Sequence, residues 1–229
     1  MFVYQNASSD ICITFADNKP VESPEYVLKV NAATQQVFLN GLSIPVLKTT
    51  VLEQPLNVEI GGLKITTPTV FNLNNQSITA KGDTDGSGVF HVQAGGSLVL
   101  DGEGEVNGVG DNDYNMAIWA DGGNVAINSG TYTNIGAKGN VDPEHFDLIY
   151  AKNGSIVEIK GGYFACETPK WTLNSSDSAP GTFIVTGGTF YKYNPAASET
   201  EPGGIVSFVP AGYDVVYDEF ADTYTVIKA

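Results

Sequence analysis

Residues 155–164 read SIVEIKGGYF and residues 182–190 read TFIVTGGTF, each of them a short apolar strand, a glycine turn and a second strand. The same plan occurs in SLVLDGEGEV at residues 97–106 and in NVAINSGTY at residues 124–132. The intervals between the last turn glycines are 26, 32 and 26 residues, the glycines being Gly104, Gly130, Gly162 and Gly188. Periods of roughly 20 to 50 residues are typical of solenoids and propellers. This unit is too small for a four-stranded blade and favours a solenoid coil.

One more apolar strand precedes each repeat, so each coil holds three strands separated by turns. These strands are Val89–Val92, Ala117–Ala120, Leu148–Ala151 and, less regularly, Trp171–Leu173. Three strands per coil is the plan of a parallel β-helix, in which inward side chains stack from coil to coil about 4.8 Å apart. The longer interval predicts a turn that bulges out within Asn134–His145.

The alternation of apolar residues predicts which side chains fill the interior. Ile159 departs from strict alternation and predicts a β-bulge in its strand. The core residues that we expect are Leu98, Leu100, Val125, Ile127, Ile156, Ile159, Phe183 and Val185.

The chain divides into three parts, and all of them are expected to be β-structure. Residues 1–50 form a small N-terminal β module with a strand at Ile11–Phe15 and a hairpin of Tyr26–Val30 with Val37–Leu39. Residues 51–200 form the parallel β-helix, including an earlier coil before the first clear repeat. Residues 201–229 form a hairpin around the acidic turn Asp218–Asp222, which caps the open end of the stack.

Composition supports an all-β chain and excludes several classes of partner. The 26 glycines, 11 tyrosines and 11 phenylalanines suit strands joined by tight turns. The formal net charge is -15 and all 11 basic residues are lysines, since the sequence contains no arginine. Such a surface repels nucleic acid and anionic membranes, so we expect neither as a partner.

Nothing in the sequence predicts a signal peptide, a membrane span or a disulfide framework. No charged segment followed by an apolar run opens the chain, and no apolar run is long enough to cross a bilayer. The two cysteines, Cys12 and Cys166, lie far apart, and Cys12 sits in an apolar alternation that predicts a half-buried side chain. We therefore expect a protein that is intracellular when it is made.

Two regions carry a family resemblance. The run from Val70 to Thr79, continued by Gly95–Gly104, resembles the opening coils of right-handed β-helix proteins of tailed phages of gut bacteria. Gly187–Phe190, Asn194–Pro195, Phe208–Tyr213 and Thr223–Val226 are similar to the terminal motif of the same head-fibre and tail-associated proteins. The resemblance covers roughly residues 55–229. It implies a right-handed parallel β-helix in a trimeric fibre or decoration component of the virion.

Parallel β-helices also carry polysaccharide lyases and glycoside hydrolases, so we searched for catalytic residues. Lyases of this fold resemble one another in using a basic residue, commonly arginine. Because the chain has no arginine, a lysine such as Lys160 would have to take that role. We interpret Lys160 as a solvated surface residue. Hydrolases of this fold use an adjacent Asp pair, and the nearest approach is Asp111-Asn112-Asp113, which suits a polar loop. Asp101 and Glu158 remain candidates for convergence on neighbouring faces. We predict no catalytic residue.

The only candidate metal ligands are Asp83, Asp85 and Ser87, in a segment that resembles the start of a calcium loop. The distal bidentate Glu is missing because residue 94 is Ala, and a glycine-rich turn explains the segment without metal. His91 and His145 have no partner spacing for zinc, and His91 is expected to point out of the solenoid. We predict no metal and no cofactor.

The sequence thus leaves an expectation about function and two alternatives. We expect a non-enzymatic virion protein, a capsid head fibre or decoration protein, attached to a major capsid or other virion protein through its N-terminal module. Outward aromatic residues could bind a host surface glycan or a sister subunit, and we favour burial in a homotrimer interface. The first alternative is a carbohydrate-binding or polysaccharide-degrading β-helix, such as a tailspike-like depolymerase. The second is a bacterial adhesin, which the missing secretion signal disfavours.

Overall fold

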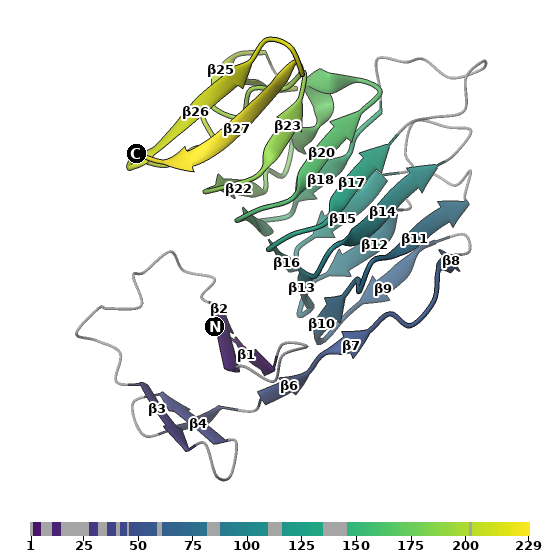
Figure 1. The fold of residues 1–229 in the computed structure, drawn as a ribbon, viewed down its shortest axis with the longest axis vertical. Coiled ribbons are helices and arrows are strands. Elements are labelled where there is room, and N and C mark those ends of the chain that lie inside the picture. The colour runs from purple at the N-terminus through teal and green to yellow at the C-terminus, as the bar shows by residue number, and fades with distance from the viewer. Residues whose placement is uncertain are drawn as a thin grey trace.

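The computed structural model describes residues 2–5, 11–14, 28–31, 36–39, 42–44, 46–58, 61–81, 88–109, 116–134, 146–201 and 203–229. These residues form a parallel β-solenoid whose walls are three sheets, which confirms the all-β fold (Figure 1). Among them, the one helical segment is a short 3-10 turn, η1 at Pro169–Trp171.

Three sheets of parallel strands make the walls of the solenoid, and each complete coil gives one strand to each wall; the last coil gives β22 and β23 alone. The six-stranded sheet contains β7 (Thr50–Val51), β10 (Pro68–Asn72), β13 (Ser97–Asp101), β16 (Asn124–Ile127), β19 (Ile156–Ile159) and β22 (Thr182–Val185). The eight-stranded sheet contains β8 (Leu56–Val58), β11 (Gln76–Lys81), β14 (Gly104–Val109), β17 (Thr131–Asn134), β20 (Tyr163–Cys166) and β23 (Thr189–Tyr191), followed by two C-terminal strands. The five-stranded sheet contains β9 (Leu63–Ile65), β12 (Gly88–Gln93), β15 (Met116–Asp121), β18 (Ile149–Lys152) and β21 (Leu173–Ser175).

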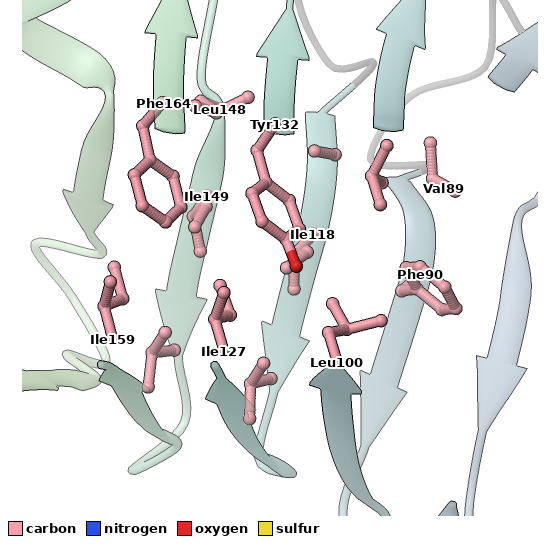
Figure 2. Close-up of a cluster of buried hydrophobic side chains, with 14 of the residues drawn as sticks. Val89, Phe90, Leu100, Ile118, Ile127, Tyr132, Leu148, Ile149, Ile159 and Phe164 are labelled. Carbon is pink, nitrogen blue, oxygen red and sulfur yellow. The ribbon is translucent and has the colours of Figure 1, made fainter. Parts of the chain in front are cut away.

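The interior is a continuous apolar column in which equivalent residues of successive coils stack (Figure 2). Tyr132, Phe164 and Phe190 stack in turn, with ring centroids 5.1 Å and 4.8 Å apart and planes 11° and 13° from parallel. All three are fully buried. The Tyr132 hydroxyl donates to the Ser129 carbonyl at 2.9 Å, so this buried polar group is satisfied.

The expected core is confirmed at all but one of its positions, and Ile156 is the exception. The register pairs Val125 with Val157 and Ile127 with Ile159, so Val157 and Ile159 point inward and are fully buried. Ile156 is only partly buried, because it lies one residue out of phase with the inward positions. The bulge predicted at Ile159 is also wrong, since the ladder through that residue is regular.

The N-terminal part forms two small sheets. β1 (Phe2–Gln5) pairs antiparallel with β2 (Ile11–Thr14) and parallel with β6 (Val46–Lys48). The predicted hairpin is confirmed as β3 (Leu28–Asn31) against β4 (Gln36–Leu39), which also pairs with β5 (Leu42–Ile44). β6 lies just before β7 in the chain and contacts β10, so the first of these sheets is joined to the opening coil.

The C-terminal hairpin predicted from the sequence is confirmed. β26 (Tyr213–Asp218) and β27 (Thr223–Lys228) pair antiparallel, and β27 adds to β23, so the hairpin extends the eight-stranded sheet (Figure 1). Before it, β24 (Ser198–Glu199) pairs with β25 (Ile205–Val206), and Phe208 packs on Phe183 with ring centroids 4.9 Å apart. This segment covers the end of the column.

Candidate functional site

The outward face of the five-stranded sheet carries a ladder of polar and aromatic side chains, one from each coil. Its members occupy equivalent positions in the register and are Lys64, His91, Trp119, Tyr150 and Asn174. The rings of His91 and Trp119 stack with centroids 3.9 Å apart and planes 6° from parallel. The ammonium of Lys152 lies 5.2 Å from the centroid of the Trp119 ring, a cation–π distance.

His91 points outward as predicted, yet it is buried within the ladder, only 8% exposed. Its Nε2 lies 3.4 Å from Oδ2 of Asp121, which also accepts a hydrogen bond at Oδ1 from Asn153 Nδ2 at 2.6 Å. Burial lowers the pKa of His91, and the hydrogen bond and charge of Asp121 oppose that shift. The group links three successive coils through β12, β15 and the turn after β18.

A second polar cluster lies at the end of the same face. Asn174 donates from Nδ2 to Oδ1 of Asp147 at 2.9 Å and to Oε1 of Glu201 at 2.8 Å. Glu201 Oε2 in turn accepts from the backbone N–H of Asp177 at 3.0 Å. Burial raises the pKa of Asp147 to about 7; the hydrogen bond from Asn174 lowers it, and the nearby Glu201 raises it further.

This arrangement of two carboxylates resembles an acid/base pair in spacing but not in access. Two acceptors on one amide NH2 lie about 5 Å apart, close to the separation in retaining glycosidases. The amide of Asn174, only 4% exposed, occupies the space between Asp147 and Glu201, where a glycosidic bond would have to lie. The cluster therefore ties the segment at Glu201 to β21 instead of presenting two free carboxylates.

Asp101 and Glu158, which the sequence analysis kept as a possible catalytic pair, do not lie together. The register places Asp101 one residue beyond the Leu100–Ile127 pair and Glu158 beside Ala126, so they occupy different rows and different coils. Asp101 Oδ1 accepts from the N–H of Gly102 at 2.9 Å, whereas Glu158 pairs with Lys160 at 3.0 Å. Lys160 is exposed as predicted and serves as the counter-ion of a buried carboxylate.

Several predicted residues fall outside the described part of the chain. They are the candidate metal ligands Asp83, Asp85 and Ser87, the Asp111-Asn112-Asp113 segment, His145 with most of the expected bulging turn, and the side chain of Cys12. Within the described ranges, no group of three or more His, Cys, Asp and Glu side chains is arranged to hold a metal ion.

Cys166 is a free, buried thiol, as expected for a chain without a disulfide framework. Its Sγ donates to the Phe146 carbonyl at 3.0 Å, and burial raises its pKa. The thiolate is the reactive form of cysteine, so this side chain is a packing residue.

Within the described residues, two hollows lie on the outward face of the eight-stranded sheet. The first, of about 390 Å³, is polar and lies over the starts of β11, β14 and β17; its lining includes Gln76, Ser77, Glu105 and Thr131. The second, of about 240 Å³, lies over the ends of β20 and β23 and is lined by Ala165, Cys166, Glu167, Pro169, Tyr191 and Lys192. Tyr163, 37% exposed, lies in register between Thr131 and Thr189 on the same face.

Sequence reasoning missed the cluster of Asp147, Asn174 and Glu201. No local pattern marks it, because Glu201 follows Asn174 by 27 residues and comes from the irregular C-terminal segment. The ladder of His91, Trp119 and Tyr150 could have been found, since these residues occupy the same position in three successive coil strands.

The described residues include no helix that is long and apolar enough to cross a membrane. Comparisons of the chain with protein-family models, with curated proteins and with solved structures found no match.

Proposed function

We propose that this chain is a non-enzymatic structural protein whose solenoid forms a rigid spacer in a larger assembly. The observation that carries the proposal is the use of outward polar side chains to link coils: His91 and Asn153 meet at Asp121, and Asp147 and Glu201 meet at Asn174. Groups that hold one another in this way add cross-links outside an already continuous core. The engagement of these side chains with one another supports a structural role.

The assembly that we propose is a phage virion, in which the chain is a capsid head-fibre or decoration protein and a homotrimer. The support is the sequence resemblance of the coils and of the C-terminal motif, together with the β-solenoid fold. In this proposal the N-terminal β module attaches the protein to a capsid or other virion protein, and the solenoid projects outward. The net charge of -15 suits a surface that must stay soluble at high local density.

The test is a truncation that starts at Val51. We expect the truncated chain to stay soluble and to be absent from particles assembled by co-expression with the capsid proteins encoded in the same genome. The full chain, produced in parallel, should co-purify with the particles. Normal incorporation of the truncated chain would show that attachment does not use the N-terminal module.

A second candidate function is the binding of a neutral polysaccharide, and the polar hollow favours it. Ser77, Glu105 and Thr131 occupy one row of successive coils there, and Gln76 lies beside them. Hydroxyl, carboxylate and amide groups spaced about 4.8 Å apart can each reach one sugar of a chain. Incubation with capsular polysaccharides, followed by size analysis, separates binding from cleavage; chain shortening would contradict the non-enzymatic proposal.

A further inference from the structure

The C-terminal end of the molecule exposes an unusual share of apolar surface. Of the eight large hydrophobic side chains found exposed in the described ranges, six lie between Ile205 and Ile227. The most exposed is Phe220, at 95%, in the turn between β26 and β27. Contiguous exposed apolar groups on a soluble protein mark interaction sites.

The turn that carries Phe220 is held rigid. Asp218 Oδ1 accepts hydrogen bonds from the backbone N–H groups of Phe220 at 2.9 Å and Ala221 at 3.2 Å. Across the turn, the Tyr217 hydroxyl donates to Asp222 Oδ1 at 3.0 Å. A rigid turn presents its aromatic ring with little further loss of conformational entropy on binding, which is how an anchor residue is prepared.

A hollow large enough to hold a phenylalanine ring lies at the same end of the molecule. The hollow of about 240 Å³ between β20 and β23 contains the faces of Ala165, Pro169 and Tyr191. A cavity of about 150 Å³ is enough to take a benzene ring. The hollow is not filled by the chain's own Phe220, because that ring is almost fully exposed.

The lining of the hollow carries one charge of each sign, Lys192 and Glu167, so its net charge does not oppose the insertion of an apolar ring. Beside Phe220 the turn carries Asp218, Glu219 and Asp222, whereas the rim of the hollow carries Lys192, an exposed ammonium 5.0 Å from the centroid of the Tyr191 ring. Glu167 also lines the hollow and balances the charge of Lys192. Within one chain the backbone N–H of Lys192 donates to the Asp222 carbonyl at 2.8 Å, so the hollow and the turn lie side by side.

We propose that Phe220 of one copy inserts into the hollow of Ala165, Pro169 and Tyr191 on a second copy, and that this contact closes the homo-oligomer. Turn and hollow are neighbours, because Tyr191 pairs with Thr223 in the ladder of β23 and β27. Each copy can therefore donate its Phe220 side chain to one neighbour and accept one in its own hollow, which is what a closed symmetric assembly requires. The inference rests on the self-association in the proposed function and names the surface that produces it.

The experiment is sedimentation velocity of the full chain and of three variants over a range of concentrations. Phe220→Ser removes the ring, Ala165→Phe fills the hollow, and Val51→Ser removes an exposed apolar side chain at the opposite end as a matched control. We expect a closed oligomer for the unmodified chain and for Val51→Ser. The dissociation constant should rise at least tenfold in each of the other two variants.

Mixing the two weakened variants gives a second readout. A Phe220→Ser copy keeps its hollow and an Ala165→Phe copy keeps its ring, so the mixture should recover a hetero-association that neither variant shows alone. Phe220→Ser should fold normally because the ring makes almost no contact within its own chain, and circular dichroism checks this. If Ala165→Phe fails to fold, Phe220→Ser still decides the question.

The possible failures are distinguishable. A monomeric unmodified chain would overturn both the proposed homotrimer and this contact, while incorporation of the protein into particles is measured separately. An oligomer that persists unchanged in Phe220→Ser would overturn the contact alone and leave self-association through another surface.

Discussion

Glycine serves two separate purposes in the turns of this solenoid, and single substitutions should separate them. A Cβ on Gly187 would lie 2.2 Å from the Lys160 carbonyl oxygen of the previous coil, which is backbone and cannot move aside. Gly154 has a φ of +72° but nothing within 4 Å of its Cβ position. We expect Gly187→Ala to lower the free energy of unfolding by about 2 to 3 kcal/mol. Gly154→Ala should cost about 1 kcal/mol through strain alone.

Urea denaturation of the two glycine variants measures both costs. Equal losses would mean that neighbouring coils move apart at little cost, so that crowding does not set the requirement for glycine at Gly187. The paired glycines were visible in the sequence, but which of them is crowded depends on how closely successive coils approach.

Asp147 should make stability depend on pH in the direction opposite to that of most carboxylates. Its pKa is raised from 3.8 to about 7 in the folded chain, so the folded state holds a proton that the unfolded state releases. Its stabilising contribution is complete below about pH 4 and is lost as the pH rises to about 7. Asp147→Asn keeps an acceptor for Asn174 and removes the ionisation.

We therefore expect the difference in free energy of unfolding between Asp147→Asn and the unmodified chain to increase between pH 4 and pH 8, in favour of the variant. The change should be on the order of 2 kcal/mol. Urea titrations at several pH values measure it, with Glu103→Gln as a control that removes an exposed carboxylate. A difference independent of pH would mean that Asp147 is ionised throughout.

At the scale of single strands, periodicity predicted most of the side chains that point into the core. It failed where two apolar residues are adjacent in the sequence. Ile156 and Val157 are adjacent and both β-branched, so sequence alternation alone could start on either. The stacked register with Val125 decides for Val157, and this choice also removes the bulge predicted at Ile159. Such contacts between coils become visible only when the strands are aligned in space.

The stacked rings of Tyr132, Phe164 and Phe190 should behave as one packed unit. Phe164 is central and contacts both neighbours, so Phe164→Ala leaves a cavity between two rings. We expect a loss of about 3 to 5 kcal/mol in the free energy of unfolding. Phe164→Leu, which keeps most of the volume, should cost less than about 1.5 kcal/mol. Similar losses for both, measured by urea denaturation, would show that the column relaxes around a missing ring.

At the scale of the whole molecule, the repeat length and turn glycines were enough to predict a three-walled solenoid, and the acidic turn Asp218–Asp222 was enough to predict the C-terminal hairpin. They could not predict the cluster of Asp147, Asn174 and Glu201, nor the hollow beside Tyr191. These features join a regular coil to the irregular segment that follows β23, and no periodic signal reaches across that boundary. The candidate sites that the sequence could not predict therefore lie where the repetition ends, whereas the ladder of His91, Trp119 and Tyr150 lies within the regular coils.

The last prediction concerns the cap, because each coil of a solenoid is stabilised mainly by its neighbours. Removing residues 213–229 would uncover β23, whose Phe190 pairs with Tyr224, and would leave its backbone as an open sheet edge. Exposed edges of this kind template association with other strands. We expect the shortened chain to form large aggregates in light scattering at concentrations where Phe220→Ser stays discrete. A shortened chain that remains soluble with an unchanged unfolding transition would show that Phe208 and the segment before the hairpin suffice to close the column.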